Sequence, residues 1–210
     1  DAPLQVNGPT GGAQLRGMPV TQLYLQAKTI NNLDDFAGMP LKELHMSGTQ
    51  VMDLSPLQGM PLEQVVLSGT QVSDLLPLRG SPLKSLWADG APISDLNPIA
   101  DLPLESLQLY GTKVFDLEPL RNSPVKVLTL SRTPITSLEP LAGTRITVLD
   151  IAQTKITDLS PLRGLPLEEL DLYLTPVTNL SPLAGMSLKI LTVQKTKIED
   201  LTPLQDMPLS

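Results

Sequence analysis

The chain repeats one 21-residue pattern nine times, and no insertion or deletion interrupts it from Val20 to Leu209. The consensus is LxxLxLxGTx(V/I)xDLxPLxGMP, numbered from 1 to 21 within each copy. The copies begin at Val20, Leu41, Leu62, Leu83, Leu104, Val125, Ile146, Leu167 and Leu188. Such a short, regular period is typical of a solenoid, in which each copy packs only against its neighbours. The sequence therefore predicts a single elongated coil.

Each copy combines a strand pattern with a tight turn. Positions 1, 4 and 6 are aliphatic, and the LxL alternation indicates a short strand with one buried face. Position 14 is Leu in every copy, from Leu33 to Leu201, and we expect it to be the deepest core residue. Only one turn of α or 3₁₀ helix fits between this Leu and the next strand.

The punctuation of the turn predicts how it begins and ends. Position 15 is usually Ser, Thr, Asn or Asp, which predicts an N-cap, and position 16 is Pro in eight copies, which suits the first helical residue. Position 19 is Gly in six copies, with Asp101, Asn122 and Asp206 in the other three. Because these residue types best tolerate a left-handed backbone, we expect a positive φ throughout this column.

The pattern resembles the leucine-rich repeat proteins over essentially the whole chain, and its DLxPLxG section is similar to the bacterial internalin-like class. The resemblance implies an α/β-type solenoid: a right-handed coil with one parallel concave β-sheet and a convex side of short 3₁₀ turns. One departure is position 9, where Thr replaces the family's Asn in seven copies. A Thr hydroxyl can still form hydrogen bonds with the neighbouring loop backbone.

The ends of the array are less regular than its middle. We divide the chain into a degenerate N-terminal repeat (1–19), nine repeats (20–208) and the start of a truncated tenth repeat (209–210). A solenoid needs caps with a polar outer face, and neither end offers a convincing one. We therefore expect either a longer parent chain or end-to-end self-association.

Composition excludes several classes of function. The net charge of −7 argues against nucleic acid as the main partner, and no apolar run approaches the ~18 residues needed for membrane insertion. The absence of Cys excludes disulfides, thiolate metal sites and a Cys nucleophile. We predict no cofactor and no metal site. The compartment stays open between the bacterial cytoplasm and the cell envelope or exterior.

Positions 3, 5 and 7 are expected to form the concave face of the sheet, because they alternate with buried positions. This face carries every Tyr, the only Trp and the only His of the chain. Exposed Tyr and Trp are common anchors of binding interfaces, although aromatic residues also favour strands for their own sake. The predicted binding residues are Tyr24, His45, Val66, Trp87, Asp89, Gln108, Tyr110, Asp150, Glu169, Asp171 and Tyr173. Within this set, Trp87, Asp89, Tyr110 and Val66 form the best anchor cluster.

Asp150 and Asp171 occupy position 5 of adjacent copies, with Glu169 beside them at position 3. They suit a pair of hydrolase carboxylates, a Ca²⁺ site or a patch for a basic partner. An open strip lacks the walled pocket of a glycosidase, and too few other oxygens surround the pair for Ca²⁺. Among these functional interpretations the residues favour an acidic recognition patch; plain solvated surface is the remaining alternative.

The sequence thus predicts a non-enzymatic module that binds a protein partner on its concave face. His45 has no converging Ser or Asp, which argues against a catalytic role. Two alternatives stay open: a carbohydrate or cell-wall recognition module, which Trp and Tyr platforms also suit, and a ligand-free scaffold segment of a larger bacterial protein.

Overall fold

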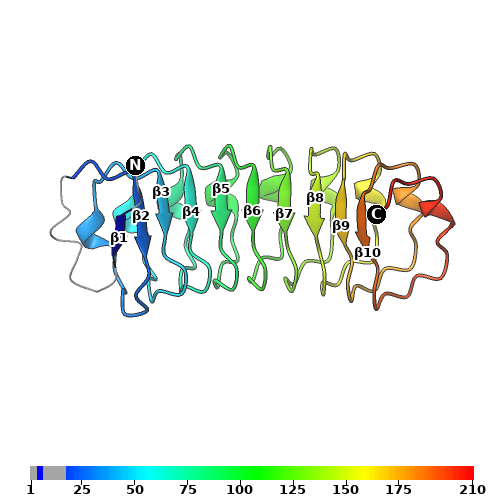
Figure 1. The fold of residues 1–210 in the computed structure, drawn as a ribbon, viewed down its shortest axis with the longest axis horizontal. Coiled ribbons are helices and arrows are strands. Elements are labelled where there is room, and N and C mark those ends of the chain that lie inside the picture. Colours follow the sequence, from blue (N-terminus) through cyan, green and yellow to red (C-terminus); the bar gives the residue numbers. More distant parts are fainter. Residues whose placement is uncertain (1–3, 7–17) are drawn as a thin grey trace.

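The computed structural model describes residues 4–6 and 18–210, and it forms one elongated solenoid (Figure 1). Ten parallel strands make a single sheet in which the strand order follows the sequence. The strands are β1 (Leu4–Val6), β2 (Gln22–Leu25), β3 (Glu43–His45), β4 (Gln64–Val66), β5 (Ser85–Trp87), β6 (Ser106–Gln108), β7 (Val127–Thr129), β8 (Val148–Asp150), β9 (Glu169–Asp171) and β10 (Ile190–Thr192). The predicted solenoid with one parallel sheet is confirmed.

One 3₁₀ turn follows each strand from β2 onward, on the side opposite the concave face. These turns are η2 (Asp34–Phe36), η3 (Ser55–Leu57), η4 (Leu76–Leu78), η5 (Asn97–Ile99), η6 (Glu118–Leu120), η7 (Glu139–Leu141), η8 (Ser160–Leu162), η9 (Ser181–Leu183) and η10 (Thr202–Leu204). Among the residues that the structure describes, no helix has the length and hydrophobicity needed to cross a membrane.

The pairing of the strands follows the 21-residue period from β2 onward. Leu44 of β3, for example, lies opposite Leu23 on one side and Val65 on the other. At the N-terminal end the spacing changes, because Leu4 of β1 also pairs with Leu23, only 19 residues away. The degenerate first copy therefore contributes a strand to the sheet with a register offset by two residues. Residues 7–17 of this copy, which include Pro9, Gly12 and Leu15, lie outside the described residues.

The core is a continuous aliphatic column that runs the length of the array. Position 14 is at most 2% exposed in the eight copies from Leu33 to Leu180, so it is buried as predicted, although it is not the deepest column, because position 4 is only 0–1% exposed in the same copies. The prediction is wrong for the ninth copy, because no later copy in this sequence covers Leu201, which is 55% exposed. Burial of one Leu side chain stabilises a fold by about 1.5–3 kcal/mol, so the interior copies gain more than the last one. The expected end-to-end association stays a prediction.

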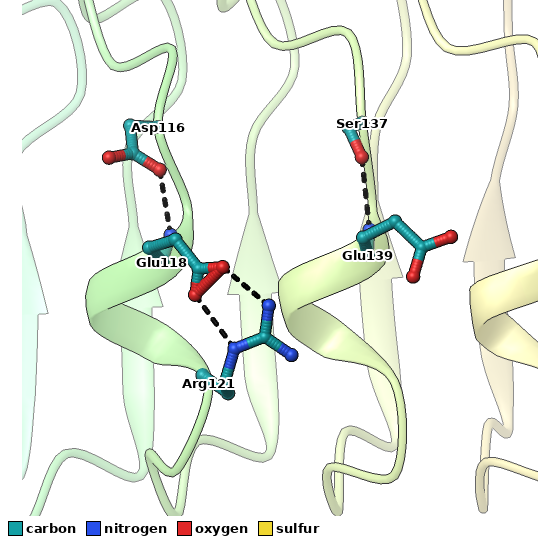
Figure 2. Close-up of polar contacts among 5 residues, drawn as sticks. All are labelled: Asp116, Glu118, Arg121, Ser137 and Glu139. Carbon is teal, nitrogen blue, oxygen red and sulfur yellow. Dashed lines mark hydrogen bonds and ion pairs between the residues drawn. The ribbon is translucent and has the colours of Figure 1, made fainter.

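The turns are capped by position 13 and not by position 15 as predicted. Position 15 is already the first residue of each 3₁₀ turn, Pro at position 16 is the second, and the preceding Leu at position 14 offers no side-chain cap. In the eight turns from η3 to η10, the side chain at position 13 accepts a hydrogen bond from the N–H of position 15. Figure 2 shows this contact from Asp116 to Glu118 (2.9 Å) and from Ser137 to Glu139 (3.2 Å) on neighbouring turns. The aspartate in the DL pair therefore satisfies an otherwise free backbone donor.

Left-handed backbone occurs at two positions of the repeat, of which we predicted one. At position 19 all six glycines and Asp206 have a positive φ. Asp101 and Asn122 do not, which corrects the prediction for these two residues. The preceding residues there, Ala100 and Arg121, are helical (ψ −39° and −37°) rather than extended, so the following residue can keep a negative φ.

Position 8 is the second left-handed column, and it contains residues that are not Gly. Its positive φ values lie between 57° and 70°. The residues are Gly48, Gly69, Gly90, Gly111, Arg132, Gln153, Leu174 and Lys195. A left-handed conformation costs an L-residue roughly 1–2 kcal/mol, so the last four copies tolerate strain that the earlier ones avoid.

Two polar rows recur along the repeat, one within each copy and one between adjacent copies. The seven Thr hydroxyls of position 9 donate to the carbonyl of position 6 over 2.5–2.9 Å, as the sequence predicted. Along position 2, Glu63 is paired with both Lys42 (3.3 Å) and Lys84 (3.0 Å). Two more ion pairs, from Lys126 to Glu105 (2.8 Å) and from Lys189 to Glu168 (2.7 Å), continue this row. These ion pairs link residues of adjacent copies.

Candidate functional site

The concave face presents one continuous column of position 5 side chains. The strand pairs place Tyr24 beside His45, His45 beside Val66 and Val66 beside Trp87. The column continues through Gln108, Thr129, Asp150, Asp171 and Thr192. Neighbouring strands lie about 4.8 Å apart, so adjacent members of the column are within contact distance.

The N-terminal half of this column is aromatic and uncharged. The rings of Tyr24 and His45 stack with a centroid distance of 4.1 Å and an interplanar angle of 10°. The Gln64 amide nitrogen donates to Nε2 of His45 over 3.4 Å. Partial burial lowers the pKa of His45, and the charge of Glu43 opposes this only in part. His45 therefore remains neutral at pH 7 and extends the apolar row.

Val66 and Trp87 are more enclosed than the sequence suggested. Val66 is only 6% exposed, because its short side chain lies between the rings of His45 and Trp87 on the adjacent strands. Trp87 is half-buried, and its indole Nε1 is buried without a hydrogen-bond partner among the described residues. Val66 is thus part of the floor of the face, whereas Trp87 still presents part of its ring.

Asp89 and Tyr110 form the neighbouring contact at position 7. The Tyr110 N–H donates to Oδ1 of Asp89 (2.9 Å), and the Asp89 N–H donates to Oγ of Ser68 (3.2 Å). Burial raises the pKa of the Asp89 carboxyl, and the Tyr110 hydrogen bond counteracts it. Tyr110 itself is 39% exposed. Within the predicted anchor cluster, Asp89 and Tyr110 are therefore joined by a hydrogen bond, Val66 and Trp87 lie side by side on adjacent strands, and Tyr110 is the more accessible ring.

The C-terminal half of the column is acidic. Asp150 and Asp171 lie directly opposite each other on β8 and β9. One oxygen of each is occupied, since Asp150 Oδ1 accepts the Ala152 N–H (3.0 Å) and Asp171 Oδ1 accepts the Tyr173 N–H (2.7 Å). Burial raises the pKa of Asp171, and the charge of Asp150 adds to the effect.

Glu169 extends this acidic half on β9 and is exposed. The ion pairs found among residues 4–6 and 18–210 involve none of Asp150, Glu169 and Asp171. Within the same residues, no cluster of three or more His, Cys, Asp or Glu side chains is arranged to hold a metal ion. The acidic half therefore offers unpaired carboxylates on an open sheet face.

A row of long side chains at position 8 borders the face, and we did not predict it. The Arg132 guanidinium lies 5.3 Å from the ring centroid of Tyr110, and its Nε donates to Oε1 of Gln153 (3.0 Å). Lys195 Nζ lies at the same distance from the ring centroid of Tyr173. The signal in the sequence was the loss of Gly at position 8 after the fifth copy. These cations hold the two tyrosine rings in place.

No family model matches the chain, and no curated protein matches its sequence significantly. Solved structures do match. An internalin (inlF) from Listeria monocytogenes is similar with a TM-score of 0.75 and 26% identity, over 88% of this chain and 64% of the internalin chain. Internalin C2 (inlC2) from the same species has a TM-score of 0.67 and 29% identity, over 74% of this chain and 71% of its own.

A leucine-rich repeat protein of Leptospira interrogans shares the fold, with a TM-score of 0.64 at 17% identity over 99% of this chain and 70% of its own. The present chain thus spans about two thirds of the length of each of these neighbours. The single parallel sheet and the regular one-turn 3₁₀ helices of this chain fit a leucine-rich repeat protein. The chain is a leucine-rich repeat protein with an internalin-like fold.

Proposed function

We propose that this chain binds a protein partner on its concave face. The internalin-like neighbours support a protein-interaction scaffold in general. The observation that carries the finer proposal is the gathering of Trp87, Tyr110 and unpaired carboxylates on one sheet face. Rigid aromatic side chains on a strand scaffold lose little conformational entropy on binding, which makes them effective anchors.

The role that we propose is non-enzymatic. The His45 ring stacks on Tyr24 and is hydrogen-bonded to Gln64, and among the described residues its ring nitrogens form no hydrogen bond or ion pair with a carboxylate that would orient the imidazole. Asp150 and Asp171 lie on neighbouring strands of an open sheet. General acid–base catalysis by such a pair needs a substrate held between the groups and shielded from water, and an open sheet provides neither.

The test compares the wild type with the Trp87→Ala/Tyr110→Ala double variant in quantitative pull-down and on a glycan array. Phe115→Ala is the matched control, because Phe115 is an aromatic residue that is exposed on a loop away from the concave face. Circular dichroism and thermal unfolding establish that each variant is folded. We expect the double variant, but not the control, to bind a protein partner with roughly tenfold or more lower affinity, because an aromatic anchor has been removed.

Other results would contradict the proposal. A partner that binds the double variant as well as the wild type would place the interface elsewhere. Selective loss of a glycan would favour carbohydrate recognition, and a wild type that binds neither proteins nor glycans would favour a scaffold segment.

A further inference from the structure

The position 5 column changes character half-way along the concave face. On β2 to β5 it consists of Tyr24, neutral His45, Val66 and Trp87. On β8 and β9 it consists of Asp150 and Asp171. Gln108 and Thr129 on β6 and β7 separate the two halves. Figure 1 shows these strands side by side in this order. The position 5 column therefore has an aromatic end and an acidic end.

The acidic end differs from the row of alternating Lys and Glu at position 2, directly before the strands. At position 2 the three glutamates Glu63, Glu105 and Glu168 each contact a Lys of an adjacent copy. Asp150 and Asp171 occupy equivalent neighbouring strands, yet no described Lys or Arg pairs with them. Two cations that border the face contact other groups, since Arg132 contacts Tyr110 and Gln153 and Lys195 lies over Tyr173. These carboxylates can therefore form ion pairs with a cationic group of a partner.

The two ends are separated by a fixed distance. Three strand intervals lie between Trp87 and Asp150, and four lie between Trp87 and Asp171. At about 4.8 Å per interval this separation is about 14–19 Å. An extended peptide advances about 3.3 Å per residue, so the distance corresponds to roughly four to six residues.

We propose that the concave face binds a polypeptide segment that lies across the strands, with a large apolar side chain against Val66 and Trp87 and Lys or Arg side chains against Asp150 and Asp171. This inference rests on the proposed function and specifies the chemistry of the partner. Charge complementarity favours one orientation of the segment, because Asp150, Glu169 and Asp171 lie together at the acidic end, whereas Glu43 and Asp89 at the aromatic end lie two strands apart. A nucleic acid or an anionic lipid surface would be repelled by the same carboxylates.

The experiment selects binders from a phage-displayed library of random 12-residue peptides on the full chain. We expect the enriched peptides to carry Lys or Arg about four to six residues from a large apolar residue. The selected peptides are then synthesised, and their affinities are measured by fluorescence anisotropy at low and high salt. Their affinity should fall roughly tenfold or more from ~20 mM to ~500 mM NaCl, because salt screens the ion pairs.

The decisive variant is Asp150→Asn/Asp171→Asn. Asn keeps the oxygen that accepts the Ala152 and Tyr173 N–H groups, so only the charge is lost and the fold is retained. The matched control is Asp101→Asn/Glu139→Gln, which removes two exposed charges from the turns. We expect the first variant to weaken the selected peptides roughly tenfold and the control to leave their affinity unchanged.

Trp87→Ala should weaken the same peptides without abolishing their salt dependence. Enriched peptides without basic residues, equal binding by both charge variants, or a library that yields no peptide dependent on Trp87 and the two aspartates would overturn the inference. The proposed function would still hold if the binding of a protein partner required Trp87 and Tyr110 but did not change when the charges of Asp150 and Asp171 were removed. The experiments therefore distinguish a failure of the proposed partner chemistry from a failure of the proposed function.

Discussion

The position 14 leucines differ in burial but not in residue type, so they allow the contribution of burial to the free energy of unfolding to be measured. Leu117 in the fifth copy is 2% exposed, whereas Leu201 in the ninth is 55% exposed. Leu→Ala at a buried site removes the transfer free energy of the side chain and leaves a cavity, which together cost about 2.7–5 kcal/mol. At Leu201 less than half of the side chain is buried and solvent fills the space, so the cost falls to about 1 kcal/mol. We therefore expect Leu117→Ala to destabilise the fold by about 2–4 kcal/mol more than Leu201→Ala does.

Urea unfolding followed by circular dichroism measures this difference. With a slope of about 3 kcal/mol per M, Leu117→Ala lowers the midpoint by about 1–2 M and Leu201→Ala by about 0.3 M. Because each copy contacts only its neighbours, hydrogen exchange should accelerate around the fifth copy in the first variant and only near β10 in the second. Equal midpoint shifts would refute the reasoning, since they would mean that the free-energy cost of the substitution does not depend on how deeply the individual leucine is buried.

Three further predictions concern the turns and the acidic end. Gly90→Ala, at φ +70° with open space around the new Cβ, should lower the free energy of unfolding in urea by about 1 kcal/mol, because the left-handed strain exceeds the entropy lost by the unfolded chain. Asn179→Ala removes the acceptor for the Ser181 N–H (2.8 Å) and should cost about 1 kcal/mol by the same assay; no loss would show that water replaces the cap. The pKa of Asp171 is raised in the folded state, so its ionisation reduces stability as pH rises through the folded pKa. Asp171→Asn should accordingly raise the melting temperature at pH 7 and leave it unchanged below the unfolded pKa of about 3.9, whereas a gain at both pH values would argue for a packing effect.

Much of the fold follows from the repeat, because a gapless period places equivalent residues at equivalent sites. The buried columns, the parallel register from β2 onward and the Thr hydrogen bonds were predictable for this reason. The exceptions occur where the neighbours of a residue are not equivalent. Leu201 has no following copy over it, and β1 joins the sheet with a 19-residue offset.

The turns show a different limit. Position 13 in every copy and position 15 in six of the nine carry small polar residues, and the sequence alone does not indicate which of the two positions lies outside the helical turn. The structure assigns the cap to position 13, as at Asp116, because the 3₁₀ turn begins one residue earlier than the prediction placed it. Asp101 and Asn122 escape the left-handed backbone because a second type of turn is available to any residue, which the glycine pattern did not reveal.

For the candidate site, the sequence predicts which columns face outward but not how their side chains pack together. The stacking of Tyr24 on His45 and the burial of Val66 depend on the sizes of side chains one strand away. Arg132 was missed because position 8 looked like a glycine column, and only its φ of 58° and its contact with Tyr110 mark it as part of the border. The binding role of the predicted residues stays a prediction.

The architecture separates the residues that hold the fold from those that face a partner. Positions 4, 6 and 14 pack between copies, whereas position 5 contacts mainly its own column, so changes at position 5 leave the core intact. Trp87 and Asp171 lie four strands apart, about 19 Å, which exceeds the ~7–10 Å within which substitutions usually couple. Their effects on the binding of one extended peptide should therefore add to within about 0.5 kcal/mol. A larger deviation would mean that a single partner side chain, or a change in the curvature of the sheet, connects the two ends of the face.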